Sequence, residues 1–271
     1  MLRHFLTLLL AATLVLSWAI ASPAYAQSEE PSFINWVEGL ESARDQAFEA
    51  TNRGDFAAAE TYWTQLIEQL PENPAFWSNR GNVRVSQNKL DEAIADYNKA
   101  IELAPTAPDP YLNRGTALEG LKRWDEAIAD YNKVLELDPD DPAAYNNRGN
   151  AEAGRGNWQQ AVDDFKRASE LVRDYAFARA NYALALYQIG ETDEAIRTMR
   201  NLVRKYPRFA DMRAALTAAL WVNGQQGEAE SNWVAAVGLD SRYKDLDWVA
   251  NVRRWSPAMV DALGKFLSLS G

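Results

Sequence analysis

The sequence repeats with a period of 34 residues, and this period limits the possible folds more than any other feature of the chain. An alanine recurs at that spacing without a gap, at Ala59, Ala93, Ala127, Ala161, Ala195 and Ala229. A repeat of this length is one supersecondary unit, and a single unit cannot bury its apolar face alone. The period therefore predicts a stack of similar units that are stabilised by contacts between neighbours.

The residues around these alanines predict two helices in each repeat. A large apolar residue follows each alanine by four positions, so both lie on one face of a helix. These residues are Trp63, Tyr97, Tyr131, Phe165, Met199 and Trp233. A second column at the same spacing consists mainly of small residues, which let the first helix of a repeat pack closely on the second: Ala47, Gly81, Gly115, Gly149, Ala183 and Thr217.

Turn and stop signals recur in the same register. The turn inside each repeat is expected at Gly54, Asn88, Lys122, Gly156, Gly190 and Gly224, where only the lysine departs from the usual turn-forming types. Proline, which cannot continue a helix, follows the second helix at Pro71, Pro105, Pro139 and Pro207. We therefore expect an all-α solenoid of about six helical hairpins over residues 40–243.

Two segments carry the clearest repeat motif. They are Pro-Ala-Ala-Tyr-Asn-Asn-Arg-Gly-Asn at 142–150 and Asp-Glu-Ala-Ile-Ala-Asp-Tyr at 125–131. In these two segments the chain resembles the tetratricopeptide repeat family. The resemblance implies antiparallel helix pairs stacked into a right-handed superhelix, with a concave groove lined by the first helix of each repeat. It also implies a protein that binds other polypeptides.

The first 26 residues have the order of a secretory signal. Arg3 precedes an apolar run over residues 5–20, and Ala24-Tyr25-Ala26 forms a small-residue cleavage site. The run is shorter than the ~20 residues that a membrane-spanning helix needs. We expect cleavage after Ala26 and a mature protein in the periplasm or the thylakoid lumen.

The remaining segments are expected to close the two ends of the stack. Residues 27–39 are interpreted as a polar linker followed by an amino-terminal cap, in which Phe33, Ile34, Trp36 and Val37 cover the first repeat. Residues 244–271 are interpreted as carboxy-terminal capping helices. Ser256 and Pro257 form an N-cap and first-turn pair that opens the last helix.

Composition removes most enzymatic chemistry. The chain has no cysteine, and its one histidine, His4, lies in the signal, so histidine bases, catalytic triads and thiolate or imidazole metal sites are not expected. We expect no enzyme, no cofactor and no metal, although a hydrolase that uses carboxylates alone stays open. The formal charge of −10 disfavours nucleic acid and direct lipid binding.

Two zones on the first helices are candidate binding sites. The central zone is polar, and its amides could hold the backbone of an extended peptide or could bond locally: Ser78, Asn79, Asn82, Asn113, Thr116, Asn146, Asn147, Asn150 and Asn181. The second zone is apolar and could form a docking patch, or could be covered by the carboxy-terminal helices: Phe177, Leu184, Tyr187 and Trp221.

An arginine follows the asparagines in three repeats, at Arg80, Arg114 and Arg148. The structural interpretation is that each stem packs between helices while the guanidinium binds a carboxylate such as Asp96 or Asp130. The alternative is a row of cations that binds an acidic partner.

These features together predict an exported adaptor or assembly factor that holds a protein or peptide segment in its groove. The Asn-Arg-Gly and Asp-Tyr-Asn-Lys motifs are similar to those of tetratricopeptide proteins of cyanobacteria and chloroplasts. This resemblance implies a role in the assembly of photosynthetic membrane complexes. The alternative is a structural envelope protein that self-associates into a homo-oligomer through its carboxy-terminal apolar face.

Overall fold

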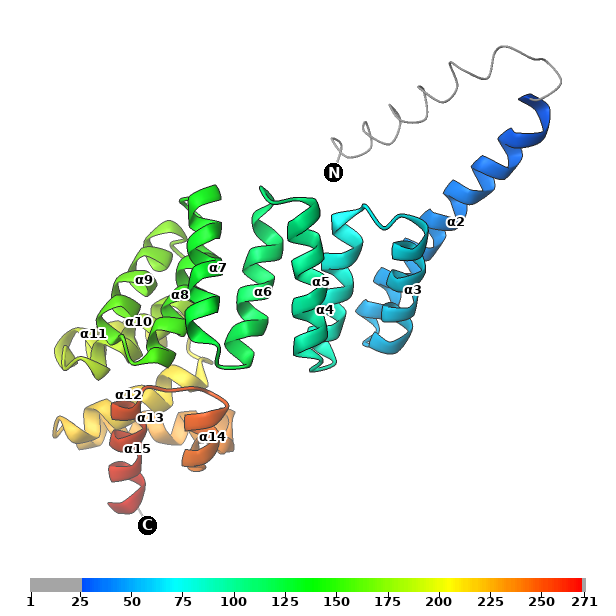
Figure 1. Ribbon diagram of the computed structural model, residues 1–271. Coiled ribbons are helices and arrows are strands. Elements are labelled where there is room, and N and C mark those ends of the chain that lie inside the picture. Colours follow the sequence, from blue (N-terminus) through cyan, green and yellow to red (C-terminus); the bar gives the residue numbers. More distant parts are fainter. Residues whose placement is uncertain (1–25, 270–271) are drawn as a thin grey trace. The chain divides into compact units, whose positions relative to one another are not determined.

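The computed structural model describes the backbone of residues 26–269 and the side chains of residues 33–268. This part of the chain is helical throughout and contains no strand (Figure 1). The all-α prediction is confirmed. The predicted signal segment lies outside the described residues except for Ala26. Among the helices that are described, none is both long enough and apolar enough to span a bilayer.

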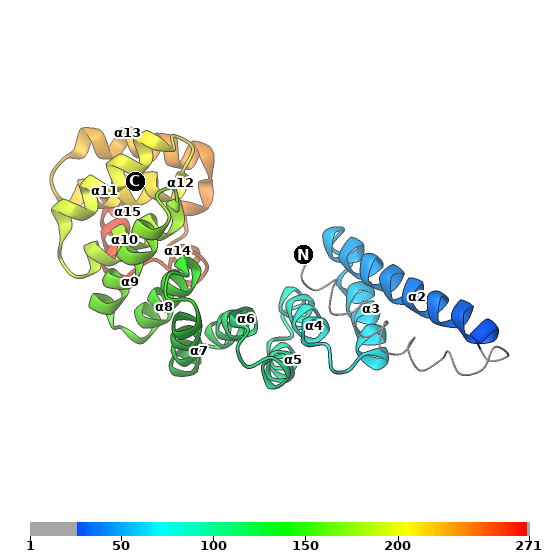
Figure 2. The same cartoon turned by 90° about the horizontal axis from the view of Figure 1, so that it is seen from above.

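The helices follow one another at the spacing of the sequence repeat. In chain order they are α2 (Ala26–Asn52), α3 (Phe56–Gln69), α4 (Pro74–Ser86), α5 (Leu90–Leu103), α6 (Pro108–Gly120), α7 (Trp124–Leu137), α8 (Pro142–Arg155), α9 (Trp158–Leu171), α10 (Ala176–Gln188), α11 (Thr192–Lys205), α12 (Ala210–Val222), α13 (Gln226–Leu239), the 3-10 helix η2 (Ser241–Lys244), α14 (Leu246–Asn251) and α15 (Pro257–Leu269). Helices α6 to α9 lie side by side in this order in both views (Figures 1 and 2).

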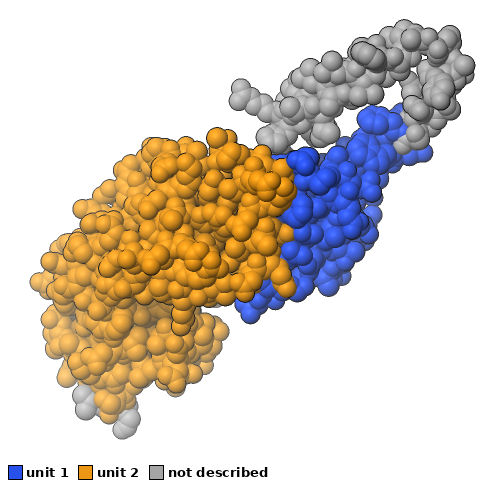
Figure 3. All heavy atoms as spheres, in the orientation of Figure 1, with its two compact units in different colours: residues 1–89 blue, residues 90–271 orange. Residues whose placement is uncertain are grey.

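The chain divides into two compact units, residues 1–89 and 90–271 (Figure 3). The division falls between the two helices of the second predicted repeat. The first unit has a small core made by α2, α3 and α4, centred on the buried indole of Trp63. The second unit contains α5 to α15, and its largest core extends from α9 to α15.

All six predicted turns adopt the same backbone conformation. Gly54, Gly156, Gly190 and Gly224 have φ between 76° and 89°, and Asn88 and Lys122 have φ of 60° and 59°. Glycine adopts this left-handed region without steric cost, whereas lysine loses roughly 1 kcal/mol there. The register of the repeat therefore fixes the conformation of the turn even where its residue is unfavourable.

The small column sets how closely the two helices of a hairpin approach. A Cβ added at Gly115 would lie 2.6 Å from Cε1 of Tyr131, and one at Gly149 would lie 2.7 Å from Cε1 of Phe165. Both rings are buried. Glycine is therefore required at these positions because the aromatic ring of the second helix occupies the space of its side chain.

The predicted linker is wrong, and the predicted amino-terminal cap is wrong for Phe33 and Ile34. Residues 27–39 are helical as part of α2, because polar composition alone does not distinguish a linker from a solvated helix. Helix α2 has 27 residues but α3 has only 14. Trp36 donates to Gln69 at the end of α3 at 3.2 Å, so the part of α2 before Trp36 has no second helix to pack on. Phe33 and Ile34 are accordingly more than half exposed, and Ala47 and Ala50 contribute to the core instead.

The carboxy-terminal helix begins at Pro257, as the sequence predicts. It packs against α10 and α12, the first helices of the fifth and sixth repeats. Met259, Leu263 and Phe266 are at most 1% exposed in this contact. Helix α15 therefore lies on the first helices rather than only at the end of the stack.

Candidate peptide-binding face

Local signals in the sequence fix helix α8, which carries most of the predicted polar site. Pro142 occupies the first turn, where its missing N–H removes no helical hydrogen bond. The Asp141 carboxylate caps the helix by accepting from the N–H groups of Ala143 and Ala144 at 2.7 and 2.8 Å. Gly156 ends the helix in the left-handed conformation. Asn146, Asn147 and Asn150 are thus held on a helix defined at both ends.

Four asparagine amides form one network across α8 and α10. Asn181 Nδ2 donates to Asn146 Oδ1 at 3.1 Å and to Asn150 Oδ1 at 3.3 Å. Asn146 Nδ2 in turn donates to Asn147 Oδ1 at 3.2 Å. Asn146 is buried, and the other three are half-buried. The local-bonding interpretation is therefore correct for Asn146 and Asn181, whose amides connect the two helices.

The same network leaves donors on Asn147 and Asn150. The Oδ1 atom of each accepts a bond from the protein, whereas within the described residues neither Nδ2 group donates one. On α6, which contacts α8, the half-buried Asn113 amide likewise makes no hydrogen bond within the described residues. We call the surface formed by Asn113, Thr116, Asn147 and Asn150 the asparagine face. An extended polypeptide offers carbonyl acceptors that match these donors.

The other predicted polar residues are placed differently. Thr116 is exposed on α6, and its hydroxyl donates to the Leu112 carbonyl at 3.1 Å. Ser78, Asn79 and Asn82 lie on α4 in the first unit, where the first two are half-buried and the third is exposed. The structure therefore brings together the residues of α6, α8 and α10 within the second unit.

The arginine column is structural in the second unit. Arg114 donates from Nε and Nη2 to Asp130 at 2.8 and 2.5 Å, and Arg148 donates in the same way to Asp164 at 2.9 and 2.7 Å. Both carboxylates are at most 4% exposed. The hydrogen bond to each carboxylate raises the pKa of its arginine. These guanidinium groups are already paired, so they do not form a row for an acidic partner.

Each arginine of the column also lies over an aromatic ring of its own helix. The guanidinium carbon of Arg114 is 5.6 Å from the centre of the Tyr111 ring, and that of Arg148 is 5.4 Å from the Tyr145 ring. In the first unit, Arg80 lies 5.0 Å from the Trp77 ring and donates to Thr64 at 3.1 Å. Stacking and pairing together fix the orientation of these side chains.

The predicted apolar docking patch is wrong for three of its four residues. Trp221 meets the Phe266 ring of α15 edge-on, with ring centres 5.2 Å apart. Leu184 is 7% exposed, its carbonyl accepts from the Ser256 hydroxyl at 3.2 Å, and Tyr187 is half-buried against the same core. The alternative, in which the carboxy-terminal helices cover this zone, is correct. Contact between α15 and helices α10 and α12 removes the apolar surface of both from water, and this burial stabilises the folded chain.

Two acidic residues that hold the carboxy-terminal segment were not found from the sequence. Oδ1 of the buried Asp211 accepts from Tyr243 Oη at 2.8 Å, from Arg253 Nε at 3.0 Å and from Trp255 Nε1 at 3.0 Å. An isolated carboxylate in the otherwise apolar α12 was the available signal, because a buried charge needs partners.

The second of these residues is Glu119, at the end of α6. It accepts from Arg254 Nη1 at 2.9 Å and from the Tyr131 hydroxyl at 3.3 Å. Burial raises the pKa of Glu119, and Arg254 acts against that rise. The segment before α15 therefore reaches α6 and limits the asparagine face on the side of α10 and α12.

The described residues contain no cluster of three or more histidine, cysteine, aspartate or glutamate side chains that could hold a metal ion. What the asparagine face offers is hydrogen-bond donors on rigid helices.

Comparison with protein families gives two overlapping sets of matches. Residues 81–122 and 120–154 match a model described as TPR repeat, and residues 152–220 match a model described as tetratricopeptide repeat. Together they span just over half of the chain. No curated protein matches the sequence.

Solved structures of low identity have the same fold. YrrB, described as a TPR protein with an unusual peptide-binding site, is 22% identical and has a TM-score of 0.55, over 71% of this chain and 97% of its own. MamA is 25% identical with a TM-score of 0.55, over 60% and 95%. A tetratricopeptide repeat protein from Parabacteroides merdae is 22% identical with a TM-score of 0.64, over 86% and 87%.

Proposed function

Because the chain belongs to the tetratricopeptide repeat family, we propose that it is an adaptor that carries out no chemistry and holds a segment of a partner protein on its asparagine face. The comparison with YrrB, whose description names a peptide-binding site, supports this class of function. Stacked repeats of this kind form extended binding surfaces that continue from one repeat to the next.

The amide network is the observation that carries the proposal. Asn181 and Asn146 fix the Oδ1 atoms of Asn150 and Asn147 toward the protein. Their Nδ2 groups are thereby oriented before a ligand binds, so that little side-chain entropy is lost on binding.

The carboxy-terminal segment sets the length of the bound segment. It occupies the first-helix faces of α10 and α12, which leaves α6 and α8 for a partner in the second unit. Two helices packed roughly 10 Å apart span roughly 20 Å, which an extended chain covers with about six residues. The proposed ligand is therefore a short extended segment recognised mainly through its backbone.

We further propose that the adaptor works outside the cytoplasm, after cleavage behind Ala26, in the assembly of photosynthetic or other membrane complexes. The order of charge, apolar run and small residues in the first 26 residues supports export. Amino-terminal sequencing of the protein from its native cell tests this, with Gln27 as the expected first residue. Co-fractionation with thylakoid membranes distinguishes the photosynthetic role from a general periplasmic one.

Self-association through the carboxy-terminal apolar face loses its basis in the structure. The residues of α15 that would form that face are buried against α10 and α12 of the same chain. No other observation favours this function.

A pull-down from envelope extracts tests the adaptor function. A variant with Asn113→Ala, Asn147→Ala and Asn150→Ala is compared with the intact protein and with a control that carries Gln159→Ala, Asn223→Ala and Asn251→Ala, three exposed amides of the same unit. We expect the control to retain the partners of the intact protein and the asparagine-face variant to lose at least one of them. Retention of every partner by both variants would refute the site.

A further inference from the structure

A basic surface lies at the end of the α10–α11 hairpin. Residues 197–213 contain six arginine or lysine residues and one acidic residue, Asp211, in a chain of formal charge −10. Asp211 is buried and bonded to the carboxy-terminal segment. Arg197 and Arg200 pair with Glu194 and Glu228, so the positive charge of the surface comes from residues 204–208 at the end of α11, which include Arg204, Lys205 and Arg208 and no acidic residue.

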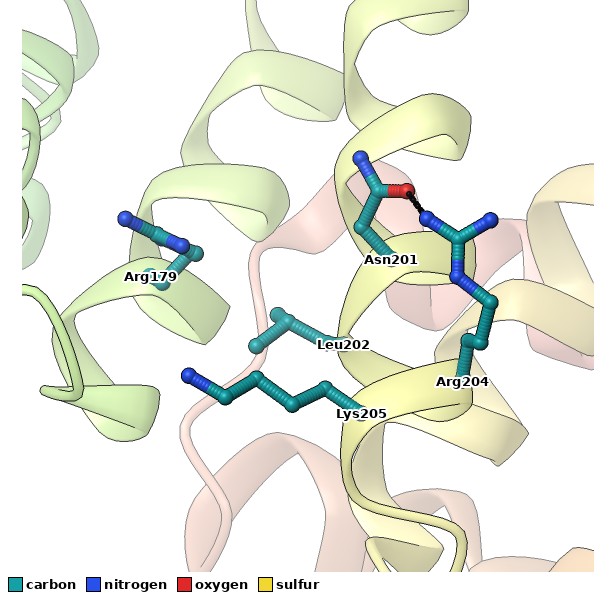
Figure 4. Close-up of a pocket in the computed structure, with 5 residues that line it drawn as sticks. All are labelled: Arg179, Asn201, Leu202, Arg204 and Lys205. Carbon is teal, nitrogen blue, oxygen red and sulfur yellow. Dashed lines mark hydrogen bonds between the residues drawn. The ribbon is translucent and has the colours of Figure 1, made fainter.

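A hollow of about 330 Å3 opens within this surface, lined by Arg179, Asn201, Leu202, Arg204 and Lys205. We call it the basic hollow. Figure 4 shows Lys205 and Leu202 extending from α11 toward Arg179, which belongs to the first turn of α10. Arg204 donates to Asn201 at 2.8 Å, which holds its guanidinium beside the opening. Three cationic side chains thus surround an apolar floor.

One carboxylate offsets this charge only in part. Asp174 pairs with Lys205, and its pKa is lowered by the hydrogen bond from Lys205 and by the charges of Lys205, Arg173 and Arg179. Within the described residues, the side chains of Arg173, Arg179 and Arg208 make no hydrogen bond or ion pair. The surface therefore keeps a positive excess available to a ligand.

An apolar hollow adjoins the basic hollow and shares Lys205 with it. It measures about 430 Å3 and is lined by Ala176, Phe177, Lys205, Tyr206, Pro207, Arg208 and Phe209. The Phe177 ring meets Phe209 edge-on at 5.9 Å and is 63% exposed. Phe177, Tyr206, Pro207 and Phe209 therefore form a contiguous apolar patch rather than a single exposed ring, and such patches mark interaction sites.

We propose that the two hollows form a second binding site, which takes an acidic polypeptide segment with one large apolar side chain next to its carboxylates. The carboxylates pair with Arg179 and Arg204, beside the Lys205–Asp174 ion pair, and the apolar side chain covers Phe177. Charge complementarity selects this occupant, because the cations of the basic hollow attract carboxylates and the adjoining apolar hollow accepts an apolar side chain. A nucleic acid or a second copy of the chain is disfavoured by repulsion from the formal charge of −10 on the rest of this chain.

This site is separate from the asparagine face. It uses the first turn of α10, the last turn of α11 and the loop after α11, whereas the asparagine face lies on α6 and α8. Each site is therefore tested by its own substitutions, and failure of one proposal does not affect the other.

Selection from a phage-displayed library of random peptides tests the proposal. The intact protein is the target, and a variant with Arg179→Glu and Arg204→Glu removes peptides that bind elsewhere. We expect enrichment of sequences in which aspartate or glutamate flanks phenylalanine, tryptophan or leucine. Enriched sequences without acidic residues, or no enrichment over the variant, would overturn the proposal.

Direct titration of one selected peptide, labelled with a fluorophore, provides the quantitative test. Arg179→Glu with Arg204→Glu, and separately Phe177→Ala, should raise Kd at least about tenfold, and the first variant should also remove the salt dependence of binding. The matched control, Lys166→Glu with Arg197→Glu, makes the same charge change at exposed positions outside the hollows and should keep Kd within about twofold. An asparagine-face variant should bind as the intact protein does. Equal Kd values for the hollow variants and the control would refute the site.

Discussion

Single side chains decide how closely the helices of a hairpin approach and which groups remain for a ligand. Gly115 and Gly149 leave room for the rings of Tyr131 and Phe165. The small residues and the large residues that recur in the sequence therefore pack against each other within a hairpin. Arg114 and Arg148 form ion pairs with the buried Asp130 and Asp164, so they are not available to a ligand. What remains on the asparagine face are neutral amides, which recognise a backbone rather than a charge.

Replacement of Gly115 tests the close approach of α6 and α7. The added methyl group of Gly115→Ala would lie 2.6 Å from a ring atom of Tyr131, which is fully buried. We expect a loss of about 1–3 kcal/mol in the free energy of unfolding, measured by urea denaturation. The control is Gly227→Ala, at a helical position with nothing within 4 Å, which should be neutral or stabilise by up to about 1 kcal/mol. Equal stability of the two variants would contradict the packing described.

Glu60 provides a pH-dependent test in the first unit. Burial raises its pKa, but hydrogen bonds from Lys89, Arg84 and Gln87 prevail and lower it to about 2 from an ordinary value of 4.5. The charged form is thus favoured in the folded state, so its stabilisation is fully present above pH 4.5 and is lost as the pH falls toward about 2.

We therefore expect Glu60→Gln to lower the unfolding free energy at pH 7 by roughly 1 kcal/mol after allowance for solvent screening. Thermal unfolding across this pH range measures the effect, and the difference from the intact protein should disappear near the pKa of about 2. Glu68→Gln, at an exposed position of the same helix, is the control. A difference in Tm that is constant with pH would be inconsistent with this role.

At the scale of elements, the carboxy-terminal segment is the part of the second unit that least resembles a further repeat. Asp211 and Glu119 bind it through side chains far away in sequence, and α15 buries its apolar face on α10 and α12. Under the proposed function, its position leaves α6 and α8 for a partner and covers α10 and α12.

The difference between what was and was not predictable from the sequence follows from the range of the interactions. The turn at Lys122 and the start of α15 at Pro257 depend on residues a few positions away, so they could be predicted. The burial of Leu184 and Trp221 depends on the packing of α15 against helices that are distant in the sequence. The apolar residues of this zone were compatible both with an exposed docking patch and with a surface covered by α15. Helix α2 was misassigned at its start because no pattern in residues 27–32 distinguishes a solvated helix from a linker.

Truncation of Phe266 tests the docking of α15. Its ring is 1% exposed and packs edge-on against Trp221 and Trp233. Phe266→Ala should cost about 3–5 kcal/mol of unfolding free energy and shift tryptophan emission to longer wavelength as water reaches both indoles. Val252→Ala, at a position that is 62% exposed, should change neither quantity. Unchanged emission in Phe266→Ala would show that α15 does not cover these residues.

At the scale of the whole molecule, the chain is a repeat protein whose second unit has a bounded set of half-buried amides and a separate basic surface. Stability in such a protein arises from contacts between neighbouring units, so surface residues can vary without loss of the fold. The proposed function accordingly uses the few groups that the packing leaves without partners, and the asparagine face is the set proposed on the first helices.

Site-specific photocrosslinking in the native cell tests this account most directly. A benzoyl-phenylalanine residue is placed at Thr116, an exposed position of the asparagine face, or at Ala129, an exposed position on the second helix of the same repeat. The account predicts a partner crosslink from position 116 that disappears when Asn147 and Asn150 are replaced by alanine, and none of that partner from position 129. A crosslink that persists without the two asparagines, or that forms equally from both positions, would contradict it.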